Sequence, residues 1–197
     1  MDKIIGCVGR KIVDFLINNN FVQNEQKEAF QYGAIVTIQS IINWIAVMIV
    51  GLLFDMFWEN LCFFITYKFL RKFTGGLHAS EFSFCFMISV LLNIAILFFV
   101  QYLKMHSCYT LIIIFEICSF IIVMVLAPII NSNKLISTKE KMIYKSISIV
   151  LSIILLILSV VLIKCRCKYV FSIAMSFSLN GILMILGVLE KRIKNQE

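Results

Sequence analysis

The feature that most constrains the fold is a succession of long apolar runs separated by short polar segments. A helix needs about 20 apolar residues to cross a bilayer, and most of the runs approach that length. Soluble domains are about 45–50% apolar and about 25% charged, whereas this chain of 197 residues is 61% hydrophobic and 15% charged. The pattern predicts an all-α, polytopic membrane protein of about six crossings, at residues 33–54, 57–70, 82–101, 108–127, 143–163 and 169–189.

Residues 1–31 differ from these runs because charged side chains interrupt their apolar pattern. Apolar residues recur there at helical spacing, as Ile4, Ile5, Val8, Ile12, Phe15 and Leu16. The pattern predicts an amphipathic helix that lies in the membrane interface, followed by a polar stretch at residues 23–31 that forms a short aqueous helix or a linker. A soluble-facing helix packed on the rest of the protein is the alternative. We therefore divide the chain into this N-terminal segment on the cytoplasmic face and a transmembrane domain at 32–197.

Basic residues predict the orientation, because cytoplasmic segments of membrane proteins carry most of the Lys and Arg. With six crossings and cytoplasmic termini, fourteen of the 18 basic residues lie inside, with the turn at 164–168 as a local exception. The net charge of +7 therefore indicates membrane orientation rather than nucleic-acid binding. The run 57–70 is short, so a re-entrant path is the alternative to a full crossing. We expect a multi-pass cell-membrane protein with the loop after residue 70 in the cytoplasm.

Polar and potentially reactive side chains are concentrated in that loop, at residues 71–85. Two adjacent glycines, His78, Glu81 and Cys85 lie within it, next to a basic cluster. Polar groups are costly to place at a membrane boundary, so a dense set of them indicates a functional site. A cysteine with a histidine is the minimal pair for an activated thiolate nucleophile.

His78 and Cys85 lie seven residues apart, which on one continuous helix separates them by about 10 Å of rise. A nucleophile and its base need roughly 2.6–3.2 Å, so His78 must lie on a loop that folds back over Cys85. Gly75 and Gly76 allow such a turn, and Ser80 is a plausible N-cap for a helix through Cys85. Glu81 or Ser83 could orient the imidazole, and the sequence does not choose between them.

Plainer interpretations of these residues exist. A lone cysteine in a spanning helix usually packs as a small hydrophobe, and we expect that of the other six cysteines. Glu116 lies within an apolar run, where neutral burial or pairing is a plainer role than a proton relay. We expect no metal and no cofactor, because two histidines without a His-Glu-x-x-His motif give little basis for a zinc site.

The arrangement Arg71…Gly75-Gly76-Leu77-His78-Ala79…Cys85 resembles the accessory gene regulator protein B (AgrB) family. The resemblance extends over essentially the full length, including a basic loop that begins at Pro128. Its specific part is short, because the other segments are generic apolar sequence. The bulky Leu77 between the glycine and the histidine is a departure from the family pattern.

The resemblance implies a membrane-embedded cysteine endopeptidase of quorum sensing, with Cys85 as nucleophile and His78 as general base. It also implies site-supporting roles for Arg71 and Gly76, and we place Gly75 and Glu81 beside them. The substrate would be a small AgrD-like precursor peptide, which loses its C-terminal tail and closes a thiolactone or lactone ring. The other partner is the lipid bilayer, and a homodimer is left open.

Two other functions fit the sequence. A small peptide or solute permease would use the polar loop as a gate, and its transport would survive loss of the Cys85 thiol. A membrane scaffold would need neither His78 nor Cys85.

Overall fold

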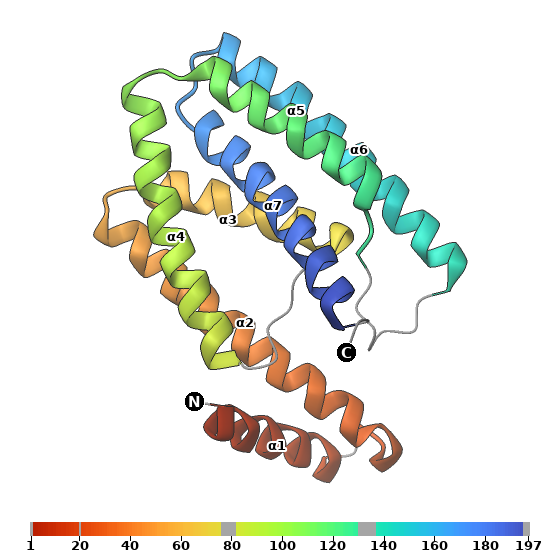
Figure 1. Cartoon of the computed structure of the whole chain (residues 1–197). Helices are drawn as coiled ribbons and strands as arrows, with labels where there is room; N and C mark the ends of the chain where they lie inside the picture. The colour runs from red at the N-terminus through yellow and green to blue at the C-terminus, as the bar shows by residue number, and fades with distance from the viewer. Residues whose placement is uncertain (1, 20, 76–81, 130–136, 195–197) are drawn as a thin grey trace.

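The computed structural model describes residues 2–19, 21–75, 82–129 and 137–194 (Figure 1). Within these ranges every regular element is a helix, which confirms the predicted all-α class. The elements are α1 (Asp2–Asn18), the 3-10 turn η1 (Asn24–Gln26), α2 (Lys27–Leu53), α3 (Phe57–Thr74), α4 (Phe82–Met105), α5 (Tyr109–Leu126), α6 (Thr138–Lys164) and α7 (Val170–Lys194).

Five helices in the described part of the chain, α2, α4, α5, α6 and α7, are long and apolar enough to cross a bilayer. This result confirms a polytopic membrane fold. The sixth predicted crossing corresponds to α3, which has 18 residues but does not meet the same criterion. Its charged side chains are the reason, namely Glu59, Lys68, Arg71 and Lys72.

Helix α7 forms the centre of the bundle and packs on α3, α4, α5 and α6 (Figure 1). In its apolar window 56% of the residues are buried, against 17–22% in the other four candidate crossings. Small residues allow this packing: a Cβ on Gly181 would lie 3.1 Å from Ser119 Oγ of α5. Close approach at small residues is a common way for membrane helices to associate, so α7 is fixed by its neighbours rather than by lipid.

Helix α1 lies beside the N-terminal half of α2, away from the α3–α7 bundle (Figure 1). Ile5 and Val13 are buried, while Val8, Ile12 and Phe15 are exposed. The helix therefore has one apolar face packed within the protein and a second one open to its surroundings.

Most of the helices extend beyond the bounds predicted from the sequence; α2, for example, begins at Lys27 rather than at residue 33. The crossing predicted to begin at residue 143 begins earlier, with α6 at Thr138, because Ser137 and Glu140 form a reciprocal capping box. The crossing predicted to end at residue 101 continues as α4 to Met105. Lys104 therefore projects from a helix, and this placement lets it reach α3.

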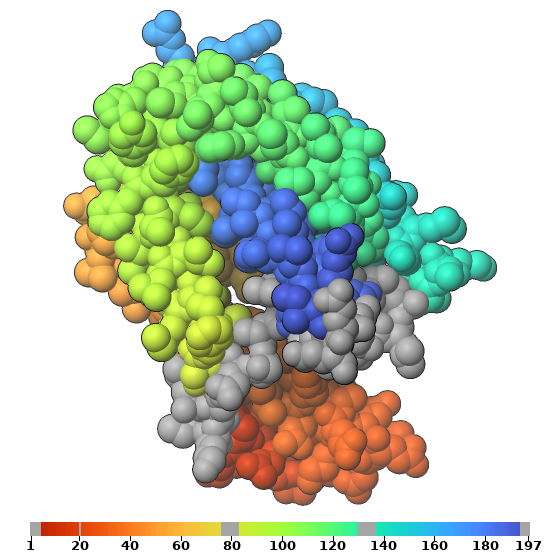
Figure 2. All heavy atoms as spheres, in the orientation of Figure 1, coloured from red at the N-terminus to blue at the C-terminus, as the bar shows by residue number. Residues whose placement is uncertain are grey.

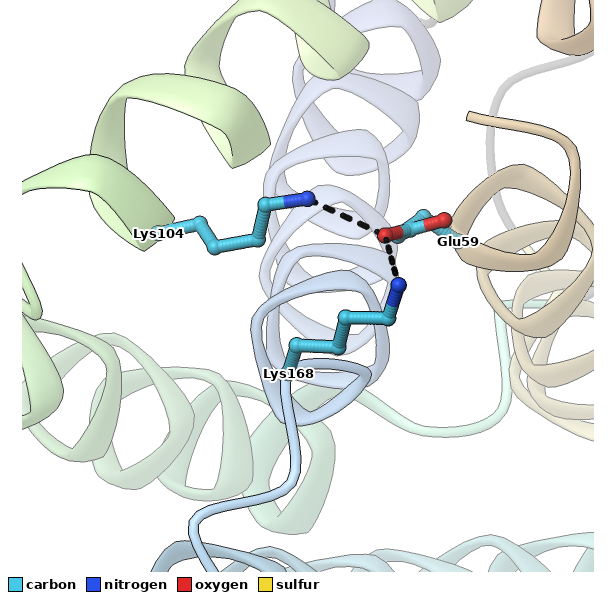
Figure 3. A network of polar contacts seen from close by, with 3 residues as sticks. All are labelled: Glu59, Lys104 and Lys168. Atoms are coloured by element: carbon cyan, nitrogen blue, oxygen red, sulfur yellow. Dashed lines mark hydrogen bonds and ion pairs between the residues drawn. The ribbon is translucent and has the colours of Figure 1, made fainter. Parts of the chain in front are cut away.

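Lys104 and Lys168 both contact one oxygen of Glu59, and we call these three residues the Glu59 cluster (Figure 3). The Nζ atoms lie 3.1 and 3.5 Å from Glu59 Oε1. Glu59 is buried at the start of α3, whereas the lysines come from the end of α4 and the turn before α7. The cluster thus holds together three segments that are distant in the sequence.

The Glu59 cluster should contribute measurably to stability. Glu59→Gln keeps the side-chain shape but removes the negative charge that both lysines contact. We expect the free energy of unfolding to fall by on the order of 2 kcal/mol, measured as a lower midpoint of thermal unfolding in detergent. Lys164→Gln changes a basic residue just before the same turn without touching Glu59, and it should leave the midpoint unchanged. Equal midpoints for Glu59→Gln and wild type would contradict this role.

Candidate active site

The end of α3 is anchored to α7 and to the segment after α5. Thr74 is fully buried, and its hydroxyl lies 3.0 Å from Leu70 O and 3.1 Å from Asn180 Oδ1. The Ile129 N–H donates a hydrogen bond of 2.9 Å to Thr74 O. These contacts fix the point at which the polar segment 71–85 leaves α3.

Gly75 makes the turn at this point, with a φ of +71°. Left-handed backbone of this kind favours glycine because other residues bring Cβ into a clash. A Cβ at Gly75 would also lie 2.0 Å from Ile129 O, closer than any atom can sit. Both the backbone conformation and the neighbouring chain therefore require glycine here.

Arg71 closes the same helix end with its side chain. Its guanidinium Nη1 donates a hydrogen bond of 2.9 Å to Gly75 O, and the Gly75 N–H donates to Arg71 O at 3.2 Å. A cation at a helix C-terminus also interacts favourably with the helix dipole. Arg71 thus positions the backbone immediately before the predicted site.

Cys85 lies in the first turn of the described part of α4 and is half-buried. Tyr67 and Lys68 of α3 are within electrostatic range of its thiol. Helix N-termini and nearby cations are the surroundings in which reactive cysteines are found. Of the seven cysteines, all of them free, Cys85 has this combination of a helix start and an adjacent basic helix face.

The remaining predicted site residues, Gly76, His78 and Glu81, lie outside the described residues, as does the predicted N-cap Ser80. Pairing of His78 with Cys85 is therefore still a prediction.

A chain of buried amides connects α2, α3 and α4, and the sequence analysis missed it. Asn60 Nδ2 donates to Val47 O at 2.6 Å, and Asn93 Nδ2 donates to Asn60 Oδ1 at 2.8 Å. A Cβ at Gly51 would lie 2.7 Å from Asn60 Nδ2, so glycine permits this approach. The signal was available: Asn93 follows Cys85 by eight residues, which places both on one helix face.

Glu116, the charged residue within α5, is buried against α6, where Ser159 Oγ donates to its Oε1 at 2.5 Å. Pairing is one of the two plainer roles expected from the sequence. Among the described residues, no group of three or more His, Cys, Asp or Glu side chains could hold a metal ion.

The family profile described as Accessory gene regulator B matches residues 9–186. The chain belongs to the AgrB family. This finding confirms the resemblance on which the sequence prediction rested, and it extends from α1 into α7.

Curated relatives agree with this assignment. An AgrB-like protein of Clostridium perfringens strain SM101 is 37% identical over 125 residues, covering 60% of this chain and 58% of the relative. AgrB-like protein 2 of strain 13 is 35% identical over 125 residues, again 60% of this chain and 58% of the relative. AgrB-like protein 1 of the same strain is 26% identical over 157 residues, which cover 79% of this chain and 82% of the relative. The chain thus spans under two thirds of the first two relatives. No solved structure matches it.

Gly75→Ala tests the anchor of the site. The new methyl group meets Ile129 O, and the backbone must leave its left-handed conformation. We expect a loss of about 1–2 kcal/mol from the backbone alone, measured by thermal unfolding in detergent. Gly33→Ala in α2 is the matched control, because nothing lies within 4 Å of its added Cβ. That substitution should be neutral or stabilising. A stable Gly75→Ala protein would show that the turn does not need glycine.

Proposed function

We propose that this chain is a membrane-embedded cysteine endopeptidase that cleaves the C-terminal tail of a small AgrD-like precursor peptide and leads to ring closure. The observation that carries the proposal is the position of Cys85. Its thiol lies at the start of α4, beside Lys68 and at the end of a polar segment anchored by Gly75. Membership of the AgrB family supports quorum-sensing peptide processing as the general role.

In the first step, the Cys85 thiolate attacks the carbonyl carbon of the scissile peptide bond. His78 takes the thiol proton as general base and gives it to the leaving amine as the C–N bond breaks. The tail departs with a free amino group, and the rest of the peptide stays on Cys85 as a thioester. Arg71, Gly75, Gly76 and Glu81 position this pair.

In the second step, a thiol or hydroxyl of the bound peptide attacks the thioester and releases Cys85. With a substrate thiol, one thioester replaces another, so this exchange is close to neutral in free energy. Hydrolysis of the thioester would instead give a free carboxylate, which is not reactive enough to close the ring. The site must therefore exclude water and hold the peptide in a reactive geometry.

The proposed topology places both termini and the His78 loop in the cytoplasm. The Glu59 cluster supports this orientation. Four basic residues lie outside in this topology, against the positive-inside pattern, and two of them, Lys104 and Lys168, are paired with Glu59. Residues 1–31 then lie on the cytoplasmic face, where the exposed apolar face of α1 can meet the lipid interface or the substrate's amphipathic leader. Arg71, Lys72 and basic residues near α6 can attract an acidic tail.

Substitution of Cys85 and His78 tests the peptidase. Wild type, Cys85→Ala and His78→Ala are co-expressed with a short peptide that has an amphipathic start and an acidic end, and precursor size is measured on gels. We expect both variants to lose more than about 99% of cleavage, since each removes a reacting group. Cys118→Ala and His106→Ala are matched controls, because they change the same residue types elsewhere and should process the precursor normally.

Normal processing by Cys85→Ala, at equal membrane levels, would contradict the proposal. Transport of the peptide without cleavage, unchanged in Cys85→Ala, would favour the permease. Binding of the peptide that depends on neither Cys85 nor His78, with no cleavage, would favour the scaffold.

A further inference from the structure

A cavity of about 50 Å³ lies between α2, α3, α4 and α7. Figure 2 shows the surface hollowed between α4 and α7. The cavity wall is mainly apolar, formed by Phe63, Phe64, Leu92 and Leu183 among others. Two amide side chains, Asn43 and Asn93, also line it. An apolar wall with a few placed polar groups is typical of binding sites, and this volume has room only for a small group.

The amide chain determines which way Asn93 faces. Val47 O can only accept, so Asn60 must present its NH₂ group there and its Oδ1 toward Asn93. Asn93 in turn presents its NH₂ to Asn60 and keeps its own oxygen for the cavity. The hydrogen bonds from Asn93 to Asn60 and from Asn60 to Val47 thus leave Asn93 Oδ1 as an acceptor that faces the cavity.

This acceptor has no hydrogen-bond donor among the described residues. Asn93 is 3% exposed, and its Oδ1 accepts no hydrogen bond from any described residue. Asn43 Oδ1 is likewise buried and unpaired within the described chain. An unsatisfied buried acceptor costs about 1–3 kcal/mol. Two of them beside one cavity indicate a site that takes a ligand with a hydrogen-bond donor.

The cavity lies within reach of Cys85. Ser89 lines it and follows Cys85 by one helical turn, about 6 Å along α4. Tyr67 lines the cavity as well and is within electrostatic range of the Cys85 thiol. An extended peptide advances about 3.3–3.4 Å per residue, so a chain held at Cys85 places its second residue beside the cavity.

We propose that this cavity is a specificity subsite for the second peptide residue before the scissile bond, where it binds a small uncharged side chain with a hydroxyl donor. The assignment rests on the proposed peptidase function. Small size follows from the volume, since a water-sized group needs about 10–15 Å³ of such space. An uncharged side chain follows from the apolar wall, where an ion would lose its hydration without a partner. Threonine or serine meets both conditions and donates to Asn93 Oδ1.

Dipeptide chloromethyl ketones test the subsite without a natural substrate. Acetyl-X-Gly-chloromethyl ketones with X as Thr, Val, Phe or Asp are added to the wild-type protein in nanodiscs. The Cys85 sulfur displaces chloride, and mass mapping gives the alkylation rate at Cys85. We expect Thr to react about 10-fold faster than its isostere Val, because Val leaves Asn93 Oδ1 unpaired. Phe and Asp should both be slower than Val.

Variants locate the effect in the cavity. Asn93→Leu should bring the Thr and Val rates together, and Ser89→Leu should fill the pocket and slow both. Met87→Leu is the matched control on α4, because Met87 is exposed and lies outside this cavity, and it should behave as wild type. Iodoacetamide has no peptide side chain that could enter the cavity. Its alkylation rate at Cys85 should therefore be similar in the wild type and the three variants, and this rate reports whether the thiol is still accessible and reactive.

Equal Thr and Val rates in wild type would overturn the subsite, as would a Thr preference that survives in both Asn93→Leu and Ser89→Leu. A different result would overturn the peptidase itself. For each cysteine, the alkylation rate with the dipeptide reagents is divided by the rate with iodoacetamide. Equal ratios at Cys85 and at the exposed Cys118 would show that Cys85 does not recognise the peptide.

Discussion

A bilayer core provides no hydrogen-bonding partner for a polar side chain, so such a group is stabilised by a partner within the protein. In this bundle several of these partners lie on a different helix. Asn60 and Asn93 join α3 to α4, Thr74 and Asn180 join α3 to α7, and Ser159 joins α6 to Glu116 of α5. Apolar contact between helices differs little from apolar contact with lipid, and it therefore selects no particular arrangement. The polar pairs do select one, because each requires a single register between its two helices.

Helix α3 makes many of these contacts, and its two ends contact different parts of the protein. At its start, Glu59 binds lysines from α4 and from the turn before α7. At its end, Thr74 and Gly75 are fixed to α7 and to Ile129, and Lys68 lies within electrostatic range of the Cys85 thiol. Two of the charges that keep α3 from qualifying as an apolar crossing thus have separate roles. Glu59 holds distant segments together, and Lys68 lies within electrostatic range of the Cys85 thiol.

Much of the fold could be predicted because apolar runs near 20 residues have few alternatives. Helix identity and approximate bounds followed from length and composition, and the prediction of a site at residues 71–85 rested on polar groups in an apolar chain. The contacts between helices could not be predicted. The turn at 164–168, which contains Lys168, looked like an exception to the charge pattern, because the partner Glu59 is distant in the sequence. Asn60 and Asn93 were passed over because one polar residue in an apolar run has no visible partner until the helices are packed.

The central claim is that Cys85 carries the peptide as a thioester. The direct measurement is the mass of the proteolytic fragment containing Cys85, after the protein is mixed with a precursor peptide and quenched in acid. The account predicts an adduct equal in mass to the precursor without its tail, which hydroxylamine removes and which is absent in His78→Ala. Cleaved precursor alongside a Cys85 that never gains mass, even at the shortest mixing times, would contradict it.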